Sequence, residues 1–409
     1  MMFVDEPARQ VPVCGSFDVV VAGGGIAGVA AAVAAARNGA TVCLLEKESA
    51  LGGLATLGIV TVWLPICDGR GHQVIGGLGE ELLLLSVADL SRERGAPRWT
   101  GLPDCWQQGG DANERKRKRY VVSFNPTAYL LALEQLLEQT GVSLLYDTRV
   151  CAVKREGDRI THLIVENKGG RAALACSVVV DATGDADVSH LAGEATESLD
   201  TNVLAGWFYA LQGEEIHLHT LTHSFSPTAT REGSEGPFFR GDDGEQVTQQ
   251  IVGSRTLIRE RLEALRAGRP DQDVQPVVVP TIACFRMTRR LLGAATLEAR
   301  HVHMWVEDAI GLTGDWRRSG PVYAIPWGTL RGIRNQNLLT AGRCISADAS
   351  VWDVTRVIPA CAVTGEAAGT AAAMASRMVS GDVSQLPVAE LQRQLVAQGA
   401  LLDRTLVET

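Results

Sequence analysis

In Phe17-Asp-Val-Val-Val-Ala-Gly23-Gly-Gly25-Ile-Ala-Gly28, an apolar run meets spaced glycines and continues into an alanine-rich segment. This order predicts a strand, a tight turn and a helix whose N-terminal N–H groups can hold a pyrophosphate. A second apolar run, Thr41-Val-Cys-Leu-Leu-Glu46, ends on an acid placed to accept hydrogen bonds from the hydroxyls of a ribose. An ordinary glycine-rich turn would not need the strand, the helix and the acid together. We therefore predict a dinucleotide site.

The segment after Glu46 indicates which dinucleotide. Lys47-Glu-Ser-Ala-Leu-Gly52-Gly53-Leu-Ala-Thr56 resembles the Leu-Gly-Gly segment of glutathione-reductase-type flavoproteins, which in that family passes under the ribityl and pyrophosphate of FAD. Val178-Val-Val-Asp-Ala-Thr-Gly184-Asp-Ala-Asp187 resembles the family's second strand-and-glycine element. Residues 338–346, followed by Arg356-Val-Ile-Pro-Ala360 and a Gly/Ala-rich helix at 362–378, resemble its C-terminal FAD element.

This resemblance runs from about residue 16 to about residue 380 and implies FAD as the cofactor. The residues expected to contact FAD are Gly23, Gly25, Ile26, Ala27, Gly28, Glu46, Lys47, Gly52, Gly53, Leu54, Ala55, Thr56, Val150, Ala182, Thr183, Gly184, Gly342, Arg343, Arg356, Val357 and Ala360. More narrowly, the chain resembles bacterial FAD-dependent oxidoreductases related to heterodisulfide reductase flavin subunits. That narrower resemblance is carried by Asn125-Pro126, Arg286-Met-Thr-Arg289-Arg290 and Tyr323-Ala-Ile-Pro326.

The pattern predicts an α/β fold, a Rossmann-like FAD-binding domain with an inserted α+β substrate domain. We expect a discontinuous FAD domain at 1–200 and 328–409, and a substrate domain at 201–327. Asn125 and Pro126 are typical of a helix start, and that helix is expected to end at Gly141. Other expected elements are helices near 79–85 and 248–267, a small meander of strands at 142–146, 148–154 and 160–166, and strands at 204–211 and 215–221.

Composition fits a folded enzyme. The 409 residues are 46% hydrophobic, and the first residues lack the features of a secretory signal. Nine cysteines without a Cys-x-x-Cys spacing argue against a disulfide framework and a cysteine-ligated cluster, so we expect a cytoplasmic protein. No stretch of about 20 uncharged apolar residues predicts a membrane span, so we expect no membrane association. A net charge of −9 disfavours nucleic-acid binding, although the run Arg115–Arg119 leaves an anionic partner or a solvated loop open. We further expect a homo-oligomer.

Two missing features narrow the chemistry. The chain has no second strand-Gly-x-Gly-x-x-Gly-helix unit and no redox-active cysteine pair, so its resemblance to glutathione reductase concerns the FAD domain alone. We expect a hydride exchange between a small organic, possibly anionic, substrate and flavin N5. The alternatives are a tRNA-modifying flavoprotein, disfavoured because little chain follows the FAD domain, and an electron-transfer or scaffold subunit that keeps FAD for structure.

Candidate catalytic residues come from the expected substrate domain. Arg286, Arg289 and Arg290 are expected either to clamp a substrate carboxylate or to form salt bridges between domains. Tyr323 is placed by the resemblance near the reacting face of the flavin, and His303 is a candidate general base. His217, His219 and His223 have metal-like spacing, but strand histidines need not converge, and we predict no metal site.

Overall fold

The computed structural model describes residues 7–88 and 121–408, with isolated residues between these ranges and at position 4. The basic run Arg115–Arg119 and most of the stretch at 91–120 lie outside the described residues. The expectations for those segments therefore stay predictions.

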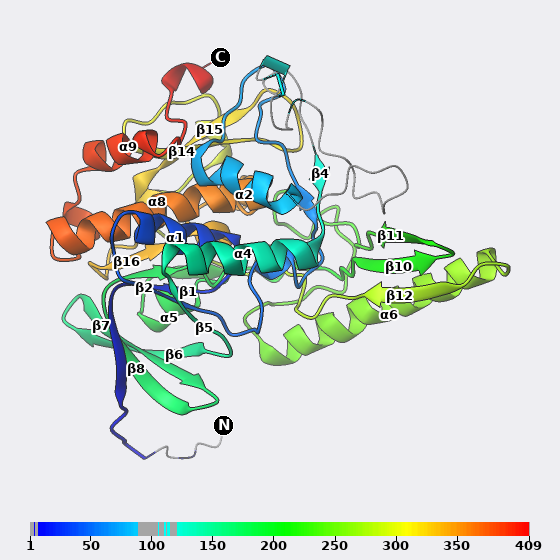
Figure 1. Cartoon of the computed structure of the whole chain (residues 1–409), viewed down its shortest axis with the longest axis horizontal. Helices are drawn as coiled ribbons and strands as arrows, with labels where there is room; N and C mark the ends of the chain where they lie inside the picture. The colour runs from blue at the N-terminus through cyan, green and yellow to red at the C-terminus, as the bar shows by residue number, and fades with distance from the viewer. Residues whose placement is uncertain are drawn as a thin grey trace.

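Within the described ranges, the apolar runs of the sequence form a seven-stranded sheet (Figure 1). Its strands are β1 (Val13–Ala22), β2 (Val42–Leu45), β5 (Ser143–Leu145), β6 (Arg149–Glu156), β7 (Arg159–Asn167), β8 (Gly170–Asp181) and β16 (Leu338–Thr340). Their order is β5-β2-β1-β8-β7-β6, and β16 also pairs with β8. The pairs among β5, β2, β1, β8 and β16 are parallel, so Ala22, Leu45 and Asp181 end in register at one edge. Ligands of open parallel sheets bind at such an edge.

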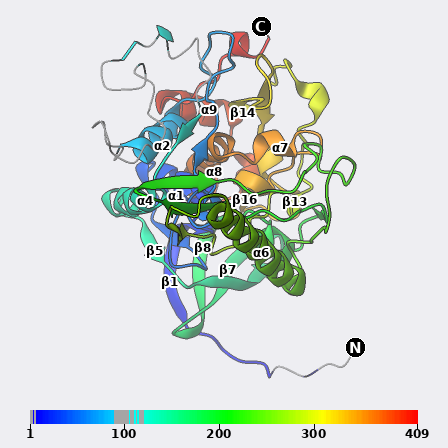
Figure 2. The ribbon, with the colours of Figure 1, turned by 90° about the vertical axis from the view of Figure 1, so that its right-hand side faces the viewer.

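Two helices of small residues cover one face of this sheet (Figure 2). Val19 and Val21 of β1 share a hydrophobic cluster with α1 (Ile26–Arg37) and α8 (Ile358–Met378). The helices approach closely, because a Cβ on Gly369 would lie 2.0 Å from the carbonyl oxygen of Ala31. The layer is completed by α2 (Gly77–Val87), α4 (Pro126–Thr140) and α9 (Val388–Ala397).

On the opposite face, residues of the parallel strands share a second hydrophobic cluster with residues of the antiparallel meander β6-β7-β8, which continues the same sheet. Val188 of α5 (Asp187–Leu191) belongs to this cluster as well. Val20 and Ala22, which alternate with the residues facing α1, contribute to this second cluster. A meander is therefore present, and residues 143–145 form a strand as predicted, but that strand does not belong to the meander. Residues 143–145 form β5, which pairs in parallel with β2 at the far side of the sheet, and the third meander strand is β8 itself.

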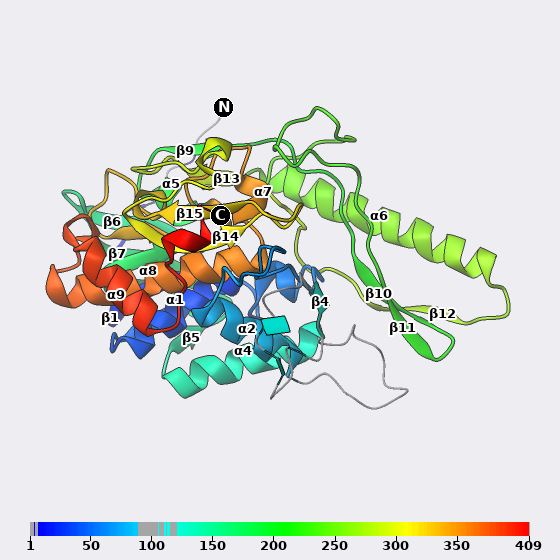
Figure 3. The same cartoon turned by 90° about the horizontal axis from the view of Figure 1, so that it is seen from above.

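An arm extends from the body (Figures 1 and 3). It consists of α6 (Gly244–Gly268) packed on a small sheet of β10 (Phe208–Gln212), β11 (Glu215–His219) and β12 (Val274–Val278). The remaining elements are β3 (Val62–Trp63), β4 (Val122–Ser123), β9 (Thr196–Ser198), β13 (Arg289–Leu291), β14 (Ala309–Gly314), β15 (Val322–Pro326), α7 (Trp352–Thr355) and short 3-10 turns such as η5 (Gly342–Cys344).

The domain division at 201–327 stays a prediction, and the packing adds one detail to it. The arm has its own small core around Phe208 and Ile258. In contrast, Ile310 of β14 and Tyr323 of β15 belong to the main cluster together with α8. Packing therefore joins the β14–β15 hairpin to the FAD half of the chain.

Among the described helices, none combines the length and the apolar character that crossing a membrane requires.

Candidate functional site

A continuous groove opens at the edge where the parallel strands end. Its two parts have volumes of about 340 Å³ and about 270 Å³ and share five lining residues, which are Gly23, Glu46, Lys47, Arg149 and Thr183. Gly23, Glu46, Lys47 and Thr183 follow β1, β2 and β8, and Arg149 is the first residue of β6, so the sheet places them at one edge. Such a crevice is the expected ligand position in this architecture.

The glycine turn has the geometry that pyrophosphate binding needs. Gly23 has φ 103°, which favours glycine, and a Cβ on Gly28 would lie 1.8 Å from the Gly23 carbonyl oxygen. A Cβ on Gly25, however, would meet nothing within 4 Å, so this backbone borders open space in the groove. The N–H groups at the start of α1 have no acceptor within the helix and are available to an anion.

The Leu-Gly-Gly segment lies directly against this turn. The Gly52 N–H donates to the Gly24 carbonyl at 2.8 Å, and Gly25 and Gly52 form an isolated parallel bridge. Residues Gly53–Ala55 form the 3-10 turn η1, and both Gly53 and Leu54 line the groove. The two glycine motifs, separate in sequence, thus form adjoining parts of one cradle.

Glu46 has the surroundings of a ribose ligand. It is 7% exposed, and its Oε2 and Oε1 accept the N–H groups of Gly24 and Glu48 at 2.6 and 2.9 Å. Desolvation raises its pKa, while the two backbone hydrogen bonds oppose that shift. Because each carboxylate oxygen has two acceptor positions, one on each oxygen remains for a ribose hydroxyl.

The residues present therefore fit FAD. Open space beside Gly25, the N-terminus of α1 and the acceptors of Glu46 suit the pyrophosphate and ribose, and Lys47 and Arg149 add positive charge. The predicted contacts that line the groove are Gly23, Gly25, Ile26, Ala27, Glu46, Lys47, Gly52, Gly53, Leu54, Ala55, Val150, Ala182, Thr183, Gly184, Arg343 and Arg356.

Five predicted contacts lie outside the lining of this groove, namely Gly28, Thr56, Gly342, Val357 and Ala360. Gly28 allows the turn to close on Gly23, and Gly342 allows η5 to approach α1, because its Cβ would lie 2.6 Å from that of Ala27. The Thr56 hydroxyl donates to the Leu51 carbonyl, and Val357 is the residue before α8. These residues are thus part of the structure around the groove and not of its lining.

The three predicted arginines separate in the structure. Arg289 pairs with Asp187 at 2.6 Å, and Arg290 pairs with Glu197 at 2.6 Å. Arg289 borders the smaller part of the groove, which Glu46 and Val150 also line. For these two residues, the observed contacts are those of the alternative in which they form salt bridges.

Arg286 lies in different surroundings. Its guanidinium stacks over the Phe225 ring at 3.9 Å, and within the described part of the chain no carboxylate forms an ion pair with it. Desolvation and the nearby Arg356 lower the pKa of Arg286 to about 9. Arg356 lines the groove and pairs with Asp353, and its buried Nε has no hydrogen-bond partner. The Asp353 carboxylate thus pairs with Arg356 and exerts a longer-range attraction on Arg286.

Tyr323 and His303 lie outside the groove lining. Tyr323 is 2% exposed within the main core, and desolvation followed by Asp315 raises its pKa. His303 contacts the carbonyl of Val407 through Nδ1 at 2.8 Å, near the end of the chain.

On β11, His219 stacks on Phe208 with centroids 4.9 Å apart. Among the described residues, no group of three or more His, Cys, Asp or Glu side chains is arranged to hold a metal ion.

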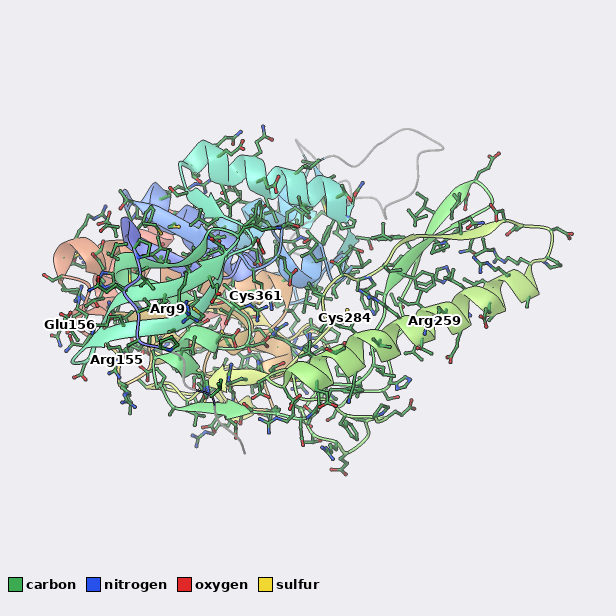
Figure 4. All side chains as sticks on the ribbon, turned by 90° about the horizontal axis from the view of Figure 1, so that it is seen from below. Arg9, Arg155, Glu156, Arg259, Cys284 and Cys361 are labelled. Carbon is green, nitrogen blue, oxygen red and sulfur yellow. The ribbon has the colours of Figure 1, made fainter. Side chains whose placement is uncertain are left out.

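Sequence reasoning missed one wall of the groove. Val247 and Ile251 of α6, together with Thr281–Ala283 and Phe285, line the end opposite the glycine turn. In Figure 4, Cys361 lies in the body, Cys284 at the base of the arm, and Arg259 further out along α6. The available signal was the apolar pair Val247 and Ile251, four residues apart in a helix that is otherwise rich in polar residues.

Comparisons with known proteins give the family. A family model described as FAD dependent oxidoreductase matches residues 18–202 and 242–395. The soluble pyridine nucleotide transhydrogenase of Chromohalobacter salexigens is 28% identical over 170 residues, which are 41% of this chain and 31% of that protein. The chain thus matches less than a third of the length of this curated relative.

Two solved structures are similar over most of the chain. A geranylgeranyl bacteriochlorophyll reductase-like protein from Thermoplasma acidophilum is 11% identical with a TM-score of 0.45, covering 96% of this chain and 90% of that one. The p-nitrophenol 4-monooxygenase of Pseudomonas putida is 13% identical with a TM-score of 0.44, covering 93% and 84%. The family model itself spans the glycine turn, Glu46, the Gly184 loop and α8. The chain therefore belongs to the FAD dependent oxidoreductase family, and its cofactor is FAD.

Proposed function

We propose that this protein exchanges a hydride between FAD and a small organic substrate that carries an anionic group. When bound, FAD supplies the two-electron acceptor or donor of the exchange. The reacting bond of the substrate would be a C–H bond next to a hydroxyl or amine. Alternatively, the exchange would form or reduce a C=C bond. The observation that supports the anionic group is Arg356 on the lining of the groove, with a second guanidinium, that of Arg286, on the same Phe225 ring but outside the lining.

The shape of the groove supports this proposal. One end holds the glycine turn and Glu46, and the other is bounded by Val247, Ile251 and Phe285. Ligand sites are commonly apolar clefts with a few placed polar groups, because apolar walls exclude water while the polar groups set orientation. Near the apolar end, Arg343 and Arg356 are cations on the lining, and Arg356 and Arg286 lie over the same Phe225 ring.

The electrostatics of the arginine pair support an anion. A cation that lacks a paired charge is costly to desolvate, and the aromatic ring of Phe225 compensates only in part. A carboxylate of the substrate would offset the excess charge on Arg286 and Arg356 and would be held by the planar guanidinium group of Arg356. Fixing that end of the substrate would orient its reacting bond within the groove.

The test uses the purified FAD-loaded protein without oxygen. Small 2-hydroxy and 2-amino acids and their uncharged amides are mixed with it, and the loss of flavin absorbance is followed. We expect the acids to reduce the flavin faster than the amides. In Arg286→Gln, reduction by the acid should be slowed about tenfold or more, because a positive charge next to Arg356 is lost, whereas reduction by the amide should be unchanged.

Arg300→Gln is the matched control, because Arg300 pairs only with neighbouring Glu298 and its side chain is 73% exposed. Its reduction rates should equal those of the wild type. Equal rates for the acid and its amide, or a wild-type rate for the acid in Arg286→Gln, would show that the arginine pair does not select the substrate. Retention of FAD by each variant, read from the absorbance spectrum before mixing, separates a lost substrate contact from a lost cofactor.

A further inference from the structure

A second polar cleft lies at the C-terminal end of α1, whereas the FAD groove lies at the N-terminal end of this helix. It has a volume of about 230 Å³ and is lined by polar residues from four helices or their ends, namely Arg37, Asn38, Glu81, Glu366, Gln394 and Gln398. We refer to it as the α1–α9 cleft. Its helices α1, α2, α8 and α9 occupy the upper left part of Figure 1.

Glu366 is the unusual residue of this cleft. It is only 3% exposed although it lies in the middle of α8. Its Oε2 accepts the N–H of Leu78 at 3.0 Å, which caps the first turn of α2. Among the described residues, its Oε1 has no hydrogen-bond partner. Burial raises the pKa of Glu366 to about 7, as expected for a carboxyl group without a cation of its own.

The cation nearest to Glu366 is already engaged. Arg37 donates to both oxygens of Glu81, at 2.7 Å each, in a bidentate pair. Pairing Arg37 with Glu81 leaves the charge of Glu366 uncompensated. The cleft also lies at the C-terminal ends of α1 and α9, where the helix dipoles are negative. Charge and dipoles together favour a positively charged occupant.

The size of the cleft and its ligand atoms favour an organic cation. At about 30 Å³ per water molecule, the cleft holds seven or eight waters, so a bare metal ion would fill a small part of it. Asn38, Gln394 and Gln398 are joined by hydrogen bonds through Gln398 Oε1, and these amides can serve a hydroxyl or amide group of an occupant.

We propose that the α1–α9 cleft binds a small organic ammonium ion, with the ammonium on Glu366 and a neutral polar end toward Gln394 and Gln398. This site is separate from the proposed oxidoreductase function, because no residue that lines the cleft also lines the FAD groove. Its occupant is not a substrate of the flavin.

The probe is ethanolammonium, titrated into the FAD-loaded protein by isothermal calorimetry. Ethylene glycol serves as the uncharged match, and potassium chloride at the same ionic strength serves as the inorganic cation. We expect saturable binding of ethanolammonium that potassium does not displace, and no binding of ethylene glycol. Absence of saturable ethanolammonium binding, or equal displacement by potassium, would overturn the assignment.

Two variants locate the site. Glu366→Gln keeps an acceptor for the Leu78 N–H but removes the charge, and it should weaken ethanolammonium about tenfold or more. Gln394→Lys supplies a tethered ammonium to the same cleft and should abolish binding of the probe without disturbing the core. Glu263→Gln, an exposed change on α6, is the control and should bind like the wild type. Unchanged affinity in both cleft variants, each with a normal flavin spectrum, would disprove the site.

Discussion

Two buried carboxylates, Glu46 and Asp181, have different roles in this protein. Glu46 is held by two backbone N–H groups and borders the groove, whereas Asp181 accepts four hydrogen bonds from Thr183 and Ser189 and is fully buried. Asp181 therefore orders the loop that carries Gly184, and Glu46 keeps acceptor positions for a ligand. The difference lies in how many of their lone pairs are already used.

At the residue scale, the first prediction concerns Glu46→Gln. An amide accepts at only one atom, so its NH₂ group would face the N–H of either Gly24 or Glu48, and one ribose acceptor would be lost. FAD binding should weaken by about 1–3 kcal/mol. The measurement is a fluorescence titration of deflavinated protein, with the exposed change Glu138→Gln as control. An unaltered dissociation constant would remove Glu46 from the ribose site.

The second prediction concerns the pH dependence of Glu366. Its pKa of about 7 in the folded state exceeds the usual 4.5, so the folded state binds this proton more tightly than the unfolded state. The contribution of Glu366 to stability is thus highest below its unfolded pKa and declines as the pH rises through about 7.

Glu366→Gln carries no charge and avoids this decline. Near pH 8, its free energy of unfolding should exceed that of the wild type by about 3 kcal/mol, and near pH 4 the two should agree. Denaturant unfolding at both pH values checks the difference. A variant that is less stable than the wild type near pH 8 would contradict it.

At the scale of elements, the contact between α1 and α8 depends on missing side chains. In Gly369→Ala, the new Cβ would lie 2.0 Å from the Ala31 carbonyl oxygen, so the two helices would have to separate. We expect a loss of about 1–3 kcal/mol in unfolding free energy, as for other overpacked cores. Gly268→Ala at the end of α6 meets nothing within 4 Å and should be neutral in the same unfolding measurement.

Elements with local signals were predictable from sequence. The Asn125 side chain caps α4 through the N–H groups of Thr127 and Ala128, Pro126 is its first residue, and Gly141 ends it with φ 73°. Each signal acts within a few residues, so the sequence carries it. The helix near 248–267 was also found, although it extends from Gly244 to Gly268.

Features that depend on distant partners were not predictable in the same way. Residues 143–145 have a strand pattern, but only the position of β2 decides that they pair in parallel with it. Likewise, the spacing of Arg286, Arg289 and Arg290 does not reveal that Asp187 and Glu197 face two of them. Val247 and Ile251 line the groove because the chain returns from the arm to the body, which no local pattern encodes.

At the scale of the whole molecule, the FAD groove joins parts of the chain that are far apart in sequence. The glycine turn, the Gly184 loop, α6, the segment at 281–285 and the start of α8 all border it. Arg343 links two of these parts directly, donating to the carbonyls of Gly184 and Phe285 at 2.8 and 2.9 Å. A ligand in this groove therefore contacts both the body and the base of the arm.

This arrangement predicts that FAD stabilises the whole fold. At about a hundred times its dissociation constant, FAD should add about 2.7 kcal/mol to the unfolding free energy of deflavinated protein, read as a higher midpoint in thermal unfolding. FMN lacks the adenosine half that Glu46 is expected to hold, so at the same concentration it should raise the midpoint less. Equal effects of FMN and FAD would mean that the nucleotide end of the groove does not contribute.

Strand β8 has a practical consequence for anyone who tags or divides this protein. Its first half pairs with β7 and its second half with β16, while β1 runs beside both. The meander is thus no detachable module, because a break within β8 would sever the strand that ends at Asp181. The exposed turn at Gly157 is the natural point to insert a fusion partner, with Gly157 itself kept because its φ of 59° favours glycine.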